Sequence, residues 1–228
     1  MERQINIIDL THEIRADAPT WDGVSGFELS VTTDFKDCAP ADLFKTQQIR
    51  CNGGIGTHVD APAHAILGGR TVDQLTLAEL SAECIVIDVS MEAHENPNYV
   101  ILPRALEKYE RAHGGIPAAS FVLFYTGWDK YWSMPKKYHN NHNFPSMDIT
   151  TAEALISRGV AGVGIDTLSL DTGANGFPVH HALLNADRYL VENVANARLL
   201  PLTGAHVLIM PMKIVGATEA PVRMLALI

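Results

Sequence analysis

Residues 84–89 read Cys-Ile-Val-Ile-Asp-Val, a short run dominated by β-branched apolar side chains. Runs of this kind are typical of strands that are covered on both faces of a sheet. Similar apolar runs recur along the chain, at residues 5–10, 120–125, 160–165, 206–210 and 222–228. The sequence therefore predicts six short, mostly buried strands.

Helical patterns lie between several of these runs, and each shows a start or stop signal. A capping box, a proline in a first turn and a glycine after a last turn are the signals that delimit helices. They predict a short helix capped by Thr76 and Glu79, a helix from Pro103 to His113 ended by Gly114-Gly115, and a helix capped by Thr150 and Glu153 and ended by Gly159. The alternation of strands and helices predicts an α/β fold with a mixed sheet.

Length and composition fit a single domain. The chain has 228 residues, of which 47% are hydrophobic and 19% charged, and this balance excludes a disordered protein. We find no internal repeat or linker, so residues 1–228 are expected to form one domain. The stretch 130–148 is polar and rich in Asn, His and Tyr, which predicts a long loop of the kind that often carries function. His139 and His142 in it are expected to be solvated.

Charge and targeting signals narrow the functional classes. The formal net charge is −9 and no basic face is visible, which argues against nucleic-acid binding. No apolar run reaches the roughly 20 residues of a membrane span. The first residues lack the pattern of a signal peptide, so we expect a cytoplasmic protein. The odd number of cysteines argues against a disulfide framework, and Cys84 is expected to be a buried core thiol.

The chemistry is expected around Gly56-Thr57-His58-Val59-Asp60-Ala61-Pro62-Ala63-His64. Side chains two residues apart in an extended segment project from the same side, so His58 and Asp60 could hold one metal ion together. Pro62 biases the preceding alanine toward extended geometry. His64 then follows a fixed turn close to this pair, where it could move protons to or from a metal-activated water.

A second cluster lies downstream. His180 and His181 follow a Gly-Phe-Pro turn, and Glu192 lies within the apolar run Tyr-Leu-Val-Glu-Asn-Val. A carboxylate in such a strand needs a partner if it is buried, and the alternative is an edge-strand glutamate that faces water. Asp166 and Asp171 could orient a ligating histidine or cap turns. Nitrogen and oxygen donors without thiolate suit zinc, manganese or ferrous iron.

The segment from Gly56 to His64 resembles the signature His-x-Gly-Thr-His-x-Asp-x-Pro-x-His of the cyclase-like metal-dependent hydrolases, which include bacterial kynurenine formamidases and isatin hydrolases. Further matching segments run along nearly the whole chain, at residues 9–11, 87–89, 164–171, 180–184, 192–193, 211–213 and 221–223. The resemblance implies a swivelling β/α/β fold, a homodimer or homotetramer, and hydrolysis of an amide in a small, often aromatic substrate such as an aryl formamide or a lactam.

The resemblance also implies roles for individual residues and a divalent cofactor, zinc or manganese, as one or two ions. The residues that match metal ligands are His58, Asp60, His180 and Glu192. In the family the aspartate often bridges two ions. The residue that matches His64 is the general acid or base, and the residue that matches Trp21 lines the substrate pocket.

One position departs from the signature, because its first histidine, a metal ligand in the family, is Gly54 here. Gln48, Cys51 and His181 are candidates to compensate for it. The leading hypothesis is a metal-dependent amidohydrolase. The alternatives are a catalytically weakened homologue that binds a small ligand, which the glycine favours, and a related lyase or cyclase. The retained His64 argues against a pure binding module, which would need no proton-transfer group.

Overall fold

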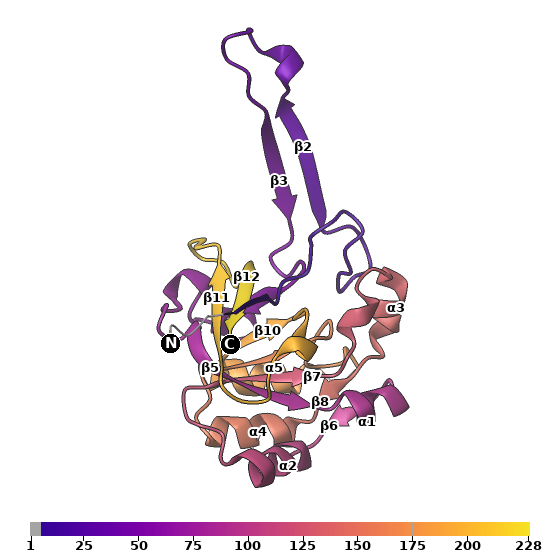
Figure 1. The fold of residues 1–228 in the computed structure, drawn as a ribbon, viewed down its shortest axis with the longest axis vertical. Coiled ribbons are helices and arrows are strands. Elements are labelled where there is room, and N and C mark those ends of the chain that lie inside the picture. The colour runs from indigo at the N-terminus through magenta and orange to yellow at the C-terminus, as the bar shows by residue number, and fades with distance from the viewer. Residues whose placement is uncertain (1–5, 175) are drawn as a thin grey trace.

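The computed structural model describes residues 6–174 and 176–228 and contains an eight-stranded mixed sheet (Figure 1). The strand order is β1-β12-β11-β5-β7-β9-β10-β4, and β12 also pairs with β4. The strands are β1 (Ile7–Asp9), β4 (His58–Asp60), β5 (Ser81–Asp88), β7 (Phe121–Tyr125), β9 (Gly162–Ile165), β10 (Tyr189–Glu192), β11 (Ala205–Pro211) and β12 (Glu219–Leu227). Because β4 pairs with both β10 and β12, the sheet folds back on itself like a barrel.

The predicted α/β class with a mixed sheet is confirmed. Strands β5, β7, β9 and β10 run parallel, and the remaining pairings of the eight-stranded sheet are antiparallel. All six predicted apolar runs contain strands, although β5 and β12 each begin three residues earlier than expected and Ile5 lies outside the described residues. Side chains alternate between the two faces: Val86 packs inside the folded sheet, whereas Ile85 and Ile87 pack under the helices.

The α-helices of the described chain are α1 (Ser90–Glu95), α2 (Arg104–His113), α3 (Pro135–His139), α4 (Ile149–Ser157) and α5 (Pro178–Asn185). All but α3 contribute apolar side chains to the core on one face of the sheet, whereas Tyr138 of α3 packs in a separate cluster. Apolar side chains of α2, α4 and α5 share one core with β5, β7 and β9. The helix predicted from Pro103 to His113 is confirmed, and Gly114 ends it at a φ of 92°. None of the helices in the described part of the chain is long and apolar enough to cross a membrane.

Two predicted helix starts are corrected. Thr76 and Glu79 do exchange capping contacts, with the Thr76 amide donating to Glu79 Oε2 at 2.8 Å, but they close a single turn. No helix fits there because β5 begins at Ser81. The later helix, α4, begins at Ile149, since Asp148 rather than Thr150 is its N-cap and accepts the Thr150 amide at 2.9 Å.

The long loop predicted at residues 130–148 is wrong. The stretch contains α3, the 3-10 turns η4 (Asp129–Tyr131) and η5 (Asn140–His142), and β8 (Ser146–Met147), which pairs with β6 (Val100–Ile101). Tyr138 and Phe144 are fully buried in a third apolar cluster. The Trp128 indole also donates to the Tyr138 carbonyl at 2.9 Å. Buried aromatic side chains therefore order this stretch, although its composition is polar and the aromatic residues do not recur with the period of a helix or a strand.

A long hairpin that we did not predict projects from the body of the molecule (Figure 1). It consists of β2 (Phe27–Thr33) and β3 (Thr46–Cys51), with the short turn η1 (Phe35–Asp37) near its tip. Its base adjoins the cavity described below, because Asn52, Gly53 and Gly54 follow β3 directly and line that cavity.

Candidate metal centre

Strand β4 places two of the predicted residues at the centre of the site. It is three residues long and pairs on both sides, so that His58 lies opposite Glu192 of β10 and Asp60 lies opposite Glu219 of β12. Val59 points to the other face and packs in the core inside the folded sheet. The predicted extended geometry of His58-Val59-Asp60 is therefore confirmed, and it directs the imidazole and the carboxylate to the same side.

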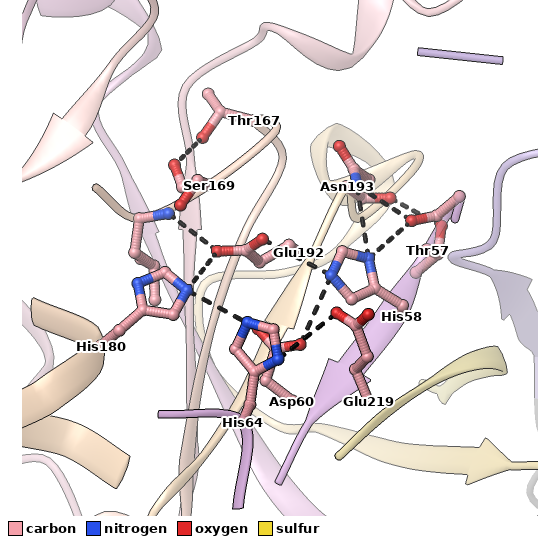
Figure 2. A network of polar contacts seen from close by, with 12 residues as sticks. Thr57, His58, Asp60, His64, Thr167, Ser169, His180, Glu192, Asn193 and Glu219 are labelled. Atoms are coloured by element: carbon pink, nitrogen blue, oxygen red, sulfur yellow. Dashed lines mark hydrogen bonds and ion pairs between the residues drawn. The ribbon is translucent and has the colours of Figure 1, made fainter. Parts of the chain in front are cut away.

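The structure brings four predicted residues together, although they come from three separate elements (Figure 2). His58 Nε2 lies 3.6 Å from Asp60 Oδ1 and 3.5 Å from Glu192 Oε2. His180, on α5, has its Nε2 3.2 Å from Glu192 Oε1 and 3.7 Å from Asp60 Oδ2. All four residues are buried. Glu192 therefore faces the cluster and not the solvent.

Hydrogen bonds fix the orientation of both imidazoles. His58 Nδ1 donates to the Gly56 carbonyl at 2.9 Å, which leaves Nε2 free toward the carboxylates. His180 Nδ1 donates to Asp171 Oδ2 at 2.8 Å, and the same oxygen accepts the His180 amide. Such a carboxylate–histidine pair is the usual support of a metal-ligating histidine. Asp166 serves differently, because it accepts the Thr126 and Trp128 amides and so holds a turn.

The electrostatics of the cluster favour positive charge. Burial lowers the pKa of His58, but the carboxylates of Asp60 and Glu192 outweigh it and leave that pKa above its usual value. Burial also opposes the His180 cation, yet the hydrogen bond to Asp171 and the nearby carboxylates of Asp60 and Glu192 raise its pKa well above the usual range. Burial raises the pKa of Asp60, but the neighbouring imidazoles, His58 first, bring it down to about 2. The cluster is thus an anionic pocket.

The donors present fit a cation. Within the described residues, Asp60 is 1% exposed and neither of its carboxylate oxygens has a hydrogen-bond partner. The nearest imidazole nitrogens, at 3.6 and 3.7 Å, are beyond hydrogen-bonding distance. A buried carboxylate without a partner is costly, and a cation would supply one. The described residues contain two sets of three possible ligands, and within each set the ligand atoms lie within 4.8 Å of one another. One set is His58, Asp60 and Glu219, and the other is Asp60, His180 and Glu192.

Sequence analysis missed Glu219. The only local signal was a carboxylate shortly before the last apolar run, and we expected that strand to begin at residue 222. The strand begins at Glu219 itself, and its pairing with β4 carries the side chain into the cluster. That pairing joins segments far apart in the chain, which is why residue spacing did not reveal it.

His64 lies at the edge of the cluster, and His64 and Trp21 both line a cavity of about 730 Å³ that also contains the cluster residues in its lining. His64 ends the turn η2 (Pro62–His64), and its Nδ1 lies 3.5 Å from Glu219 Oε2 (Figure 2). Trp21 stacks on His142 with ring centroids 3.9 Å apart. His139 and His142 each contact the Trp21 carbonyl at 2.8 Å and are half-buried, so they are less solvated than expected, and neither belongs to a ligand group in the described chain.

None of the three candidates proposed to compensate for Gly54 belongs to either ligand group in the described chain. Gln48 lies exposed on the hairpin, and Cys51 packs against the third apolar cluster. His181 is exposed and lines the cavity. Gly54 does face the cluster, because a Cβ atom built on it would lie 3.3 Å from His58 Nε2.

Comparison with known proteins places the chain in a family. A family model described as "Putative cyclase" matches residues 8–172. The chain belongs to the cyclase family. Its similarity to isatin hydrolase of Roseibium aggregatum is 32% identity over 187 residues, covering 76% of this chain and 71% of the relative. Kynurenine formamidase of Salinibacter ruber is 27% identical over 223 residues, with 95% of each chain covered.

A solved structure extends the likeness to three dimensions. Isatin hydrolase A from Ralstonia solanacearum superposes with a TM-score of 0.88 at 29% identity, covering 98% of this chain and 92% of that one. The cyclase-family fold expected from the sequence is therefore confirmed. The matched region of the family model includes β4 and its histidine and aspartate, but α5, β10 and the start of β12 lie beyond it.

Proposed function

We propose that this cyclase-family protein is a metal-dependent hydrolase of an amide bond in a small aromatic substrate, an aryl formamide or a lactam. His58, Asp60, His180 and Glu192 are the ligands, and the cation is zinc or manganese. The observation that carries the proposal is the convergence of two oriented imidazoles on a buried aspartate whose two oxygens have no hydrogen-bond partner in the described structure. The relatives named isatin hydrolase and kynurenine formamidase support the choice of substrate class.

The residues around the ligands transfer protons, contact the substrate and orient a ligand. A bound divalent cation polarises a carbonyl and lowers the pKa of water. His64, at the cavity edge, accepts a proton as the water oxygen bonds to the carbonyl carbon and then delivers it to the nitrogen, whose bond to that carbon breaks in the following step. Trp21 and Phe177, with ring centroids 5.3 Å apart, supply an aromatic wall for the substrate ring. Asp171 holds the His180 ring in place through its 2.8 Å hydrogen bond.

Removal and return of the metal tests this proposal. We expect chelated protein to lose turnover of an aryl formamide or of isatin, and to regain it with added zinc or manganese. In water enriched in ¹⁸O, hydrolysis should place one labelled oxygen in the carboxylate product. Turnover without label would support the alternative lyase or cyclase chemistry. Binding of both compounds without turnover would support the weakened, ligand-binding homologue, and full activity in metal-free protein would contradict the role of the cation.

We further propose that the protein is a homodimer or homotetramer and that the β2–β3 hairpin contributes to the contact. Leu29 and Ile49 are cross-strand partners, and Val31 shares their face of the hairpin. Their exposed fractions are 50%, 64% and 48%. A two-stranded hairpin with an uncovered apolar face is marginally stable alone in water, so a second copy of the chain is the expected cover.

Light scattering tests the assembly. We expect a mass of at least twice the 24.9 kDa of one chain. Replacing both Leu29 and Ile49 by lysine should weaken association by about tenfold or more, since two apolar contacts are lost to charged groups. Glu28→Gln on the same strand is the matched control and should leave the mass unchanged. A wild-type protein that is monomeric at all concentrations would contradict the proposal.

A further inference from the structure

Glu219 faces Asp60 across two paired strands. The two residues are direct partners in the antiparallel register of β12 and β4, so their side chains lie on the same face, with Cβ atoms about 5 Å apart. Like charges in this arrangement repel each other and destabilise the pairing. Asp60 is 1% exposed and the Glu219 side chain is 28% exposed, so water screens this repulsion only in part. A cation between them would turn repulsion into attraction.

The Glu219 carboxylate occupies the space that a side chain at position 54 would take. A Cβ atom on Gly54 would lie 2.7 Å from Glu219 Oε2, and the same point is 3.3 Å from His58 Nε2. Gly54 is not among the glycines with positive φ, so its backbone does not require a glycine. Because Gly54 has no side chain, the Glu219 carboxylate can occupy this space.

An independent observation points to two cations. The two oxygens of Asp60, both without a hydrogen-bond partner in the described structure, point to different neighbours. Oδ1 faces His58 Nε2 at 3.6 Å, and Oδ2 faces His180 Nε2 at 3.7 Å. Each oxygen therefore faces a different imidazole, and the ligand group that contains His58 also contains Glu219.

We propose that Glu219 is a metal ligand that replaces the absent side chain at position 54, so that this chain keeps the two-cation arrangement around Asp60 that the family resemblance implies. This inference rests on the proposed metal-dependent function. With Glu219 as ligand, the metal position formed by His58, Asp60 and Glu219 offers one imidazole and two carboxylates. Such an oxygen-rich set shifts the preference of this position toward hard ions such as Mn²⁺, relative to a set with a second imidazole.

Glu219 has a second neighbour, and the proposal accounts for it. Its Oε2 lies 3.5 Å from His64 Nδ1, so the carboxylate could serve only as the partner of that imidazole. A carboxylate offers about four lone-pair sites on its two oxygens, however, and can bind a cation while it also accepts a hydrogen bond. If the imidazole were its only partner, removing Glu219 would leave metal binding unchanged.

Metal titration of Glu219→Gln separates these cases. We expect calorimetry with Mn²⁺ alone and with Zn²⁺ alone, together with elemental analysis, to give two ions per chain in the wild type. Glu219→Gln should retain the ion held by Asp60, His180 and Glu192, and should bind the ion of the His58 group at least about 100-fold more weakly. Loss even of a residue that only supports a ligand lowers metal affinity by about 10–100-fold. Glu153→Gln, an exposed carboxylate on α4, is the control and should bind like the wild type.

A ligand exchange provides the converse test. Gly54→His alone should not gain affinity, because the new side chain meets the Glu219 carboxylate. Gly54→His combined with Glu219→Ala should restore the second ion and favour Zn²⁺ over Mn²⁺ more than the wild type does. This readout is independent of turnover.

The outcomes distinguish the inference from the function on which it rests. Two ions bound with unchanged affinity by Glu219→Gln, or a single ion in the wild type, would overturn the role of Glu219 and leave the proposed hydrolase intact. A wild-type protein that binds neither metal would overturn both.

Discussion

Asp60→Asn should remove metal from both ligand groups and lower turnover by about 10³-fold or more, because a hydrolase of this kind depends on a cation to activate water. Asp60 is the residue that the two groups share. Asparagine keeps the size of the side chain but has one oxygen, and its amide directs hydrogens toward the place of a cation. With Asp60 1% exposed, water has little access to replace the lost ligand. Elemental analysis and kcat of the metal-reloaded protein measure both effects.

Two comparisons make this result specific. Asp17→Asn changes an exposed aspartate, 69% exposed at its side chain, and should alter neither metal content nor kcat. His58→Ala removes one imidazole and should release the ion of the group that contains Glu219, whereas the group of Asp60, His180 and Glu192 keeps its ligand atoms and should hold its ion. If Asp60→Asn retained a full complement of metal, the assignment of this residue as the shared ligand would be wrong.

The body of the fold was predictable because its central strands are buried on both faces. Residues 84–89 and 120–125 are continuous apolar runs, a signal that needs no knowledge of their neighbours. The hairpin differs, because Phe27, Leu29 and Val31 alternate with polar residues while β3 reads Thr-Gln-Gln-Ile-Arg-Cys. The alternation in β2 is a strand signal that could have been used. The polar composition of its partner concealed the pair.

The residues of the site likewise include some that local sequence predicts and some that it does not. The spacing of His58 and Asp60 placed them correctly because β4 is extended, a local property. The local sequence made His180 and Glu192 candidates, but their assignment as ligands came from the family resemblance, since nothing in their own segments decides between a buried and an exposed carboxylate. Glu219 could be found only through the pairing of β12 with β4. When a site is built from separate strands, the residues that belong to it are decided by the register between distant segments. That register cannot be recognised in a single sequence.

His64→Ala should lower kcat by about 100-fold or more while both metal positions keep their ions. His64 belongs to neither ligand group within the described structure, and its Nδ1 lies against Glu219 at the edge of the cavity. Its side chain is 34% exposed, so removing it leaves space that solvent and small molecules can enter. We therefore expect added imidazole to restore part of the turnover of this variant, by carrying the proton that the side chain carried.

His181→Ala is the matched control for this experiment, because His181 is a neighbouring exposed histidine that lines the same cavity without entering either ligand group. It should keep most of its kcat and show no response to imidazole. The decisive comparison is metal content against kcat in the two variants. A loss of metal from His64→Ala would make His64 a ligand, since a proton-transfer group leaves the cation in place. Retained metal, low kcat and rescue by imidazole together are the combination that proton transfer through His64 requires.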